Sequence, residues 1–370
     1  MSSEISPDAR MLAEALARAG KSDHLRNAIF EALRNAEAEA ADGPTFRDQV
    51  RWPLVLSLLR EVKDHRVVLE NGLAIDVSAD SRIEQAFLLS SMAHPDHVWE
   101  PQTTRLLVAL SDGVDHIVVG GAYIGDQVLP LARAASKRTP PGLIHAFEPF
   151  SWAFERLRHN LDLNNITNVI PQRVALWDRS NATLRIEGHS GLTSTVPVEV
   201  EQKGEQELAG EVIASVTIDD YVHTQGLPSV GLIMLDTEGG EERALYGAND
   251  LLSRPQPEAP NLVFEIHRKF VDWTGGLSNT AIIQFLTTRG YSVFAVRDFQ
   301  SNYPMSGHPI EIIPLDHVYL EGPPHGFNVM ATKDPGLVQR LGLRVVQGVS
   351  PKLLLHKDPA LHHPIFSNSP

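Results

Sequence analysis

The sequence HIVVGGAYIGD, residues 116–126, decides how the rest of this chain is interpreted. An apolar run over 116–120 ends at two glycines, and a helical pattern begins near residue 126. Glycine lets a ligand approach the backbone closely, and the first N–H groups of a helix lack partners within it. The stretch therefore predicts a buried strand, a turn able to hold a cofactor, and a helix. A tight strand–helix connection without a ligand is the simpler alternative.

On either side of this stretch, apolar runs alternate with helical patterns. The expected strands lie at 116–120, 143–147, 168–174, 230–235, 261–266 and 291–296, and the expected helices lie near 126–138, 150–164, 240–253 and 278–289. Apolar strands separated by helices are typical of a mostly parallel sheet with helices on both faces. We therefore predict an α/β fold, which binds its ligand at the carboxyl ends of the strands.

Three regions depart from this alternation. Helical spacing predicts helix over 7–41 and again over 52–62, and Asn71-Gly72 predicts a hairpin between 66–69 and 73–77. Residues 181–218 are expected to form an antiparallel β insertion. The predicted domains are an N-terminal helical extension (1–65), a main domain (66–335) and a C-terminal extension (336–370).

Composition narrows the classes of partner. The 370 residues carry a formal net charge of −14 and include no cysteine. An acidic chain without a basic run is a poor match for a phosphate backbone, so no nucleic-acid partner is expected. The acidic N-terminus lacks the features of a signal peptide, and no apolar window is long enough to span a bilayer. We expect a cytoplasmic location, no membrane partner, and possible homo-oligomer formation through the N-terminal helices.

The second expected strand ends at His145-Ala146-Phe147-Glu148-Pro149. An acidic residue at this point can accept hydrogen bonds from both ribose hydroxyls of a nucleoside. Pro149 suits the first turn of the helix that follows. The alternative for Glu148 is a helix-terminal charge that suits the helix dipole.

Two later strand ends carry further polar groups. Asp236 and Glu238 follow the fourth strand and could orient a hydroxyl, act as a base or bind a cation. Glu241 is expected to cap the next helix. The fifth strand ends at Glu265-Ile266-His267, and His267 is a candidate base. We take Asp236, Glu238 and His267 as the candidate catalytic residues.

The glycines of the first turn lie at 120, 121 and 125. A dinucleotide-binding turn needs G-x-G-x-x-G, so this spacing disfavours an NAD(P)-dependent oxidoreductase, which remains an alternative.

In their order and spacing, these motifs resemble the FkbM family of methyltransferases. The resemblance rests on 118–126, 146–149, Ile218-Asp219-Asp220-Tyr221, and 235–241 with Gly247-Ala248 after it. It implies a Rossmann-like, seven-stranded S-adenosylmethionine (SAM) methyltransferase sheet whose last strand is antiparallel. It also implies SAM as cofactor and O-methylation as the reaction.

Carried over to this chain, the resemblance assigns Gly121, Gly125 and Asp126 to the SAM loop, Glu148 to the ribose, and Asp236 with Glu238 to an acidic signature. The full predicted cofactor-binding set is Gly120, Gly121, Tyr123, Gly125, Asp126, Glu148, Pro149 and Ala175. A divalent cation is possible but not predicted.

Two positions depart from the family pattern. An acidic residue is usual at 118 or 119, where this chain has Val118-Val119, and Asn is usual where Tyr123 stands. The function expected is a SAM-dependent O-methyltransferase acting on a hydroxyl of a sugar, glycan or secondary metabolite. The departures keep open a second possibility, a catalytically inactive binding or scaffold protein with the same fold.

Overall fold

A computed structural model describes residues 7–186, 198–199, 211–300, 302–305, 307–319 and 326–353. The chain forms two compact units. The first comprises residues 1–98 with 302–304, and the second comprises 99–301 with 305–370. The predicted domain limits at 65 and 335 stay predictions.

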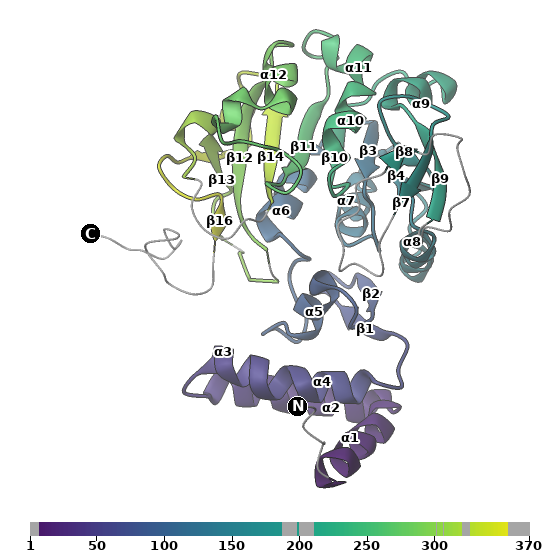
Figure 1. Ribbon diagram of the computed structural model, residues 1–370, viewed down its shortest axis with the longest axis vertical. Coiled ribbons are helices and arrows are strands. Elements are labelled where there is room, and N and C mark those ends of the chain that lie inside the picture. The colour runs from purple at the N-terminus through teal and green to yellow at the C-terminus, as the bar shows by residue number, and fades with distance from the viewer. Residues whose placement is uncertain are drawn as a thin grey trace. The chain divides into compact units, whose positions relative to one another are not determined.

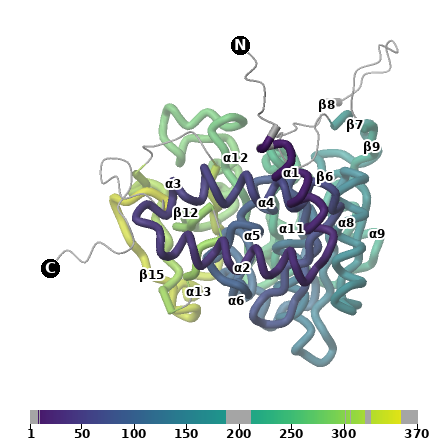
Figure 2. Tube along the Cα trace, turned by 90° about the horizontal axis from the view of Figure 1, so that it is seen from below, coloured from purple at the N-terminus to yellow at the C-terminus, as the bar shows by residue number. Residues whose placement is uncertain are grey.

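The first unit is mainly helical. Its elements are α1 (Pro7–Gly20), α2 (Asp23–Glu39), α3 (Gly43–Phe46), a π-helical turn (Arg47–Arg51), α4 (Trp52–Leu59), β1 (His65–Val68), β2 (Ala74–Val77) and α5 (Arg82–Leu88). Helices α1 and α4 lie side by side (Figures 1 and 2). A Cβ on Gly20 would overlap the carbonyl oxygen of Leu58, so glycine permits this approach.

The predicted helix over 7–41 is instead two helices. Ser22 separates them, because its extended backbone cannot continue α1 and its Oγ accepts from Leu25 N at the start of α2. The predicted hairpin is confirmed: β1 and β2 are antiparallel, and Gly72 takes φ 82° in the turn.

The second unit is built on a large, mostly parallel sheet. Its strands are β3 (His116–Gly120), β4 (Leu143–Phe147), β5 (Val169–Gln172), β10 (Leu232–Leu235), β11 (Asn261–Ile266), β12 (Ser292–Phe299), β13 (Glu311–Pro314), β14 (Phe327–Thr332), β15 (Arg344–Val345) and β16 (Lys352–Leu353). The order across the sheet is β15-β13-β12-β14-β11-β10-β3-β4-β5, with β16 paired to β12 (Figure 1).

The predicted fold class is confirmed by this topology. Strand β3 lies between β4 and β10, so the connections leave it in opposite directions along the sheet. The seven strands from β5 across to β12 include one antiparallel member, β14, which comes last in sequence. This is the Rossmann-like arrangement in which ligands bind where the strand order reverses.

Helices cover the sheet: α6 (Pro101–Leu110), α7 (Val128–Ala135), α8 (Ser151–Leu163), α9 (Ile218–Thr224), α10 (Glu241–Tyr246), α11 (Asn249–Ser253), α12 (Ala281–Thr287) and α13 (Leu337–Arg340). The helix predicted over 240–253 is two helices. Its break falls at Gly247-Ala248, where a Cβ on Gly247 would overlap the carbonyl oxygen of Trp177. None of the helices in the described ranges has the length and apolar character needed to cross a membrane.

The predicted β insertion is present over the residues described. Strand β7 (Thr183–Ile186) pairs antiparallel with both β8 (Val198–Glu199) and β9 (Glu211–Val216), and β6 (Ala175–Leu176) pairs in parallel with β9 at the edge. Residues 187–197 and 200–210 of the predicted insertion lie outside the described ranges.

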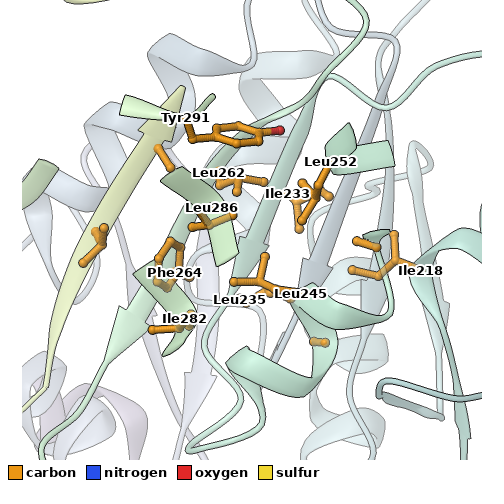
Figure 3. Packing of buried hydrophobic residues seen from close by; sticks show 14 of the residues in the cluster. Ile218, Ile233, Leu235, Leu245, Leu252, Leu262, Phe264, Ile282, Leu286 and Tyr291 are labelled. Atoms are coloured by element: carbon orange, nitrogen blue, oxygen red, sulfur yellow. The ribbon is translucent and has the colours of Figure 1, made fainter. Parts of the chain in front are cut away.

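A large apolar cluster lies on one face of β10 and β11 (Figure 3). Ile233, Leu235 and Phe264 point from the strands towards α9, α10, α11 and α12, with Leu245 and Leu286 packed on them. Alternate residues of a strand face opposite sides. Strand β10 is buried along its whole length, as expected for a parallel strand covered on both faces.

The turn after β3 gives a stability prediction. Gly121 and Gly113 have nearly the same backbone, φ 78° and φ 77°, but a Cβ on Gly121 would overlap the carbonyl oxygen of Asp236, whereas a Cβ on Gly113 would meet nothing within 4 Å. Gly113→Ala should lose about 1–2 kcal/mol, the cost of a left-handed residue with a side chain. Gly121→Ala should lose clearly more, or fail to yield folded protein, because β3 and β10 must move apart. Urea unfolding of both variants measures the difference, and equal losses would contradict the close approach.

Candidate functional site

The candidate residues gather at the carboxyl ends of β3, β4, β10 and β11, which are neighbours in the sheet. Parallel strands present their carboxyl ends at one edge, so turns far apart in sequence meet there. Residues 121–126, 148–152, 236–241 and 265–267 all follow or end these strands.

The glycine-rich turn is held from both sides. Gly121 N and Ala122 N both donate to the carbonyl oxygen of Phe147, at 2.9 and 3.0 Å, which ties the turn to the end of β4. On the other side, Gly121 touches the backbone of Asp236. Gly125 at φ 95° then turns the chain into α7. The turn is fixed by its own backbone before any ligand binds.

Glu148 is buried beside this turn, with 4% of its surface exposed. Its Oε2 accepts from Tyr123 N at 2.8 Å and its Oε1 from Phe150 N at 2.9 Å. A carboxylate has about four acceptor positions, so each oxygen can take one more hydrogen bond. Burial raises the pKa of Glu148 to about 7. The prediction that Pro149 lies in the first turn of the next helix is wrong: α8 begins at Ser151 with Phe150 as its N-cap, so Pro149 lies in the connection before the helix.

Tyr123 has an unusual backbone for a bulky residue. Its φ is 46°, a left-handed value that Asn adopts more readily than Tyr. This conformation points its N–H at Glu148. Its ring lies 5.8 Å, centroid to centroid, from Trp152, whose other contact is the Arg156 guanidinium at 5.4 Å. Tyr123 therefore both donates its backbone N–H to Glu148 and forms an aromatic pair with Trp152.

The structure places the remaining predicted cofactor residues as follows. Asp126 is buried near Glu148, and its charge adds to the rise in the pKa of that carboxyl. Gly120 is the last residue of β3, packed against the side chains of Leu235 and Leu176. Ala175 lies in β6 and is buried in the apolar cluster of the smaller sheet.

The loop after β10 is organised around Glu241. Its buried carboxylate accepts from Thr237 N at 2.6 Å, Thr237 Oγ1 at 2.9 Å and Gly239 N at 3.0 Å. Glu238, at φ 54°, stands between these two anchored residues. Glu241 thus fixes the turn that carries Glu238. The prediction that it caps the next helix is wrong, because Gly240 is the N-cap of α10 and no side chain caps that helix.

Carboxylates crowd this part of the sheet edge. Burial, together with the charges of Glu265 and Glu238, raises the pKa of Asp236 well above its ordinary value. Burial also raises the pKa of Glu238, against the opposing charge of Lys269. Like charges close together favour keeping a proton on one of them. The structure therefore brings Asp236 and Glu238 together and adds Glu265 to them.

His267 follows β11 directly. Its Nδ1 accepts from Lys269 N at 2.9 Å, and its ring lies 5.4 Å from that of Phe270. These contacts lie within its own loop.

Glu100 is a member of the acidic group that sequence reasoning missed. It precedes α6 with φ 53°, is buried, and accepts from Asn328 Nδ2 at 2.7 Å. Asn328 is paired with Glu265 across β14 and β11, which brings Glu100 into this group. Burial and the charge of Asp298 raise the pKa of Glu100 to about 8. The available signal was an acid directly before Pro101, a residue favoured at the start of a helix.

Over the described ranges, no three His, Asp or Glu side chains converge closely enough to hold a metal ion.

A family model matches part of the second unit. The family model described as the methyltransferase FkbM domain matches residues 120–293 and confirms the resemblance drawn from the sequence. The matched range contains Glu148, Asp236, Glu238, Glu265 and His267. No curated protein matches the chain.

Several solved structures are similar to this chain. An O-methyltransferase from Bacillus cereus in complex with SAH shares 14% identity over 62% of this chain and 78% of its own, with a TM-score of 0.34. The O-methyltransferase TomG from Streptomyces achromogenes, involved in tomaymycin synthesis and bound to SAM, shares 12% identity over 65% of this chain and 84% of its own, with a TM-score of 0.34. TYW2 from M. jannaschii, in complex with AdoMet, shares 13% identity over 72% and 84%, with a TM-score of 0.36.

The buried acids give a prediction for stability against pH. Glu148 and Glu100 have raised pKa values in the folded protein, about 7 and about 8, against 4.5 as the ordinary value. Between pH 4.5 and the raised pKa values, the folded state holds protons that the unfolded state has released. The free energy of unfolding therefore falls as the pH rises through this range. Urea unfolding should show a free energy of unfolding that declines from about pH 5 to pH 8. The decline should become shallower in Glu148→Gln and Glu100→Gln, and not in Glu155→Gln on the exposed face of α8. A flat profile would show that these carboxyls are not buried as described.

Proposed function

We propose that the protein, whose residues 120–293 match the family model of the methyltransferase FkbM domain, transfers the methyl group of SAM to a hydroxyl oxygen of a sugar, glycan or secondary metabolite. The observation that carries the proposal is the pairing of two groups at one sheet edge. A buried carboxylate, Glu148, follows β4 and lies beside the glycine turn at the end of β3. Two further carboxyl groups, Asp236 and Glu238, follow β10, which is the neighbour of β3 on its other side.

Glu148 is suited to hold the ribose. Two acceptor positions of its carboxylate are used by Tyr123 N and Phe150 N, which fixes its orientation. The two others can accept the vicinal hydroxyls of the SAM ribose. The Tyr123–Trp152 pair, 5.8 Å apart beside this carboxylate, offers an apolar surface for the adenine. Gly121, Gly125 and Asp126 form the turn along which the rest of SAM lies.

SAM supplies a methyl group on a positively charged sulfur. Methyl transfer is an in-line displacement, and the protein contributes orientation and exclusion of water. A sugar hydroxyl is a weak nucleophile, so a base within hydrogen-bond reach assists it. A carboxylate whose pKa is raised is a stronger base than an ordinary one, and the pKa values of Asp236 and Glu238 are both raised. His267 is the third candidate, at the end of the adjacent strand.

Neutral polyols fit these surroundings better than anionic acceptors. The chain carries a net charge of −14, and its site is lined by carboxylates that would repel a phosphate or an acidic sugar. Carboxylates readily accept hydrogen bonds from hydroxyl groups. This favours an uncharged or cationic acceptor.

The cofactor assignment is tested by binding. Calorimetric titration with SAM and with S-adenosylhomocysteine should give micromolar affinity, and Glu148→Ala should weaken it at least about tenfold, since charge-assisted hydrogen bonds are worth about 1.5–3 kcal/mol each. Glu155→Ala, on the exposed side of the same helix region, should bind like the wild type. A folded wild-type protein that binds neither ligand would support the scaffold alternative instead.

The catalytic assignment is tested by turnover. Transfer of tritiated methyl from SAM to a panel of neutral mono- and oligosaccharides should fall about 100-fold or more in Asp236→Asn, Glu238→Gln or His267→Ala, whichever is the base. Calorimetry on the same variants should show SAM binding retained. Full turnover in all three would remove them from the mechanism. Activity that survives EDTA unchanged would exclude a divalent cation as the activating group.

A further inference from the structure

His267 lies on a loop that packs against the turn carrying Glu238. It follows β11, and the neighbouring strand β10 leads into Asp236 and Glu238. A Cβ on Gly239 would lie 2.8 Å from atoms of the Phe270 ring, so this ring rests directly on the turn beside Glu238. The ring of His267 lies 5.4 Å from that of Phe270, centroid to centroid. Phe270 thus packs against both His267 and the turn that carries Glu238.

The backbone that follows His267 forms a tight turn around it. Phe270 N and Val271 N both donate to the carbonyl oxygen of His267, each at 2.9 Å. Lys269 N donates to the side chain, at Nδ1 of His267, also at 2.9 Å. The imidazole is therefore hydrogen-bonded to the backbone of its own turn, and the turn sets the orientation of the ring.

The hydrogen bond from Lys269 determines which ring nitrogen of His267 carries the hydrogen. A backbone N–H can only donate, so Nδ1 must accept with its lone pair and cannot itself carry a hydrogen. In a neutral imidazole one nitrogen is a donor and the other an acceptor, and the bond made by one nitrogen sets the state of the other. Nε2 of His267 therefore carries the hydrogen and meets its surroundings as a donor.

A general base takes up a proton on a lone pair. In His267 the lone pair of Nδ1 accepts from Lys269 N, and Nε2 already holds a hydrogen. We infer that His267 binds the acceptor as a hydrogen-bond donor through Nε2–H and does not take the acceptor's proton. This inference rests on the proposed function and deepens it, because it removes His267 from the candidate bases and leaves Asp236 and Glu238.

A donor beside two carboxyl groups suits a polyol. Carboxylates accept hydrogen bonds from hydroxyl groups, whereas an imidazole N–H donates to an oxygen lone pair. A sugar presents both on neighbouring carbons, a hydroxyl to be methylated and an adjacent hydroxyl or ring oxygen. His267 holds the second oxygen, and the proton of the first moves to Asp236 or Glu238. The first oxygen bonds to the methyl carbon, and the sulfur–methyl bond breaks with its electron pair left on sulfur.

Nitrogen-15 NMR of the ligand-free protein tests the position of the hydrogen, because protonated and unprotonated ring nitrogens resonate far apart. The signals of His267 are those missing in His267→Gln. At about pH 8, where an ordinary histidine is neutral, we expect the hydrogen on Nε2 and none on Nδ1. Lys269→Ala is the control: it removes the ammonium and keeps the backbone N–H, so it should leave the tautomer unchanged. A hydrogen on Nδ1 of the wild type, or a changed tautomer in Lys269→Ala, would overturn the inference.

Kinetics with SAM and a neutral saccharide that accepts methyl test the contact with the acceptor. His267→Ala should raise the KM for the saccharide about 3- to 10-fold, the worth of one hydrogen bond, with a smaller change in kcat. His267→Gln should largely restore KM, because its amide nitrogen reaches the position of Nε2. His267→Asn, whose amide nitrogen reaches only the position of Nδ1, should not restore it.

Two kinetic results would overturn the inference. One is an unchanged KM in His267→Ala. The other is a fall in kcat of about 100-fold or more in both His267→Ala and His267→Gln, as expected when a general base is lost. The NMR measurement needs neither SAM nor an acceptor, so a failure to bind SAM would count against the proposed function and not against the assigned tautomer.

Discussion

The contact between Gly121 and the backbone of Asp236 is the constraint on which the site depends. The turns after β3 and β10 meet there without room for a Cβ. The strand order reverses at β3, because the chain continues from it to neighbours on opposite sides. In an α/β sheet this is the place where ligands bind, and the contact lies there. The glycine turn, held on its other side by Phe147 O, is thereby placed between Glu148 and Asp236. A side chain at 121 would separate the carboxylate proposed to hold SAM from the carboxylates proposed to act on the acceptor.

Burial of carboxylates gives this edge its chemical character. Each carboxyl at the edge lies in surroundings that oppose its charge, and the pKa values of Glu148, Glu100, Asp236 and Glu265 are all raised. Burying a carboxyl group that would ionise in water lowers the stability of the folded protein. Proteins retain such groups mainly at functional sites. Negative charge at this edge attracts the positively charged sulfonium of SAM. It attracts the uncharged product, S-adenosylhomocysteine, less strongly.

Much of the site is shaped by residues that need not touch a ligand. Glu241 folds the loop 237–239 around its carboxylate and so sets the position of Glu238. Asn328 does the same for Glu100, across the antiparallel strand β14. Backbone strain is concentrated at the same places, since Tyr123, Glu238 and Glu100 all have positive φ. Left-handed residues with side chains are held by their surroundings, and they cluster at functional sites.

The sequence by itself determined the sheet, the glycine turn and the acids at strand ends, because these features are local. Apolar runs mark β3, β4 and β11 with correct limits, and the strand tips carry Glu148 and Asp236 directly. The sequence could not locate the breaks at Ser22 and Gly247 within helical patterns, because capping and a close contact with Trp177 O decide them. Only the tertiary structure brought Glu100 and Asn328 to Glu265. These residues come from chain segments remote from one another, and burial and mutual charge, which no local pattern encodes, give them their properties.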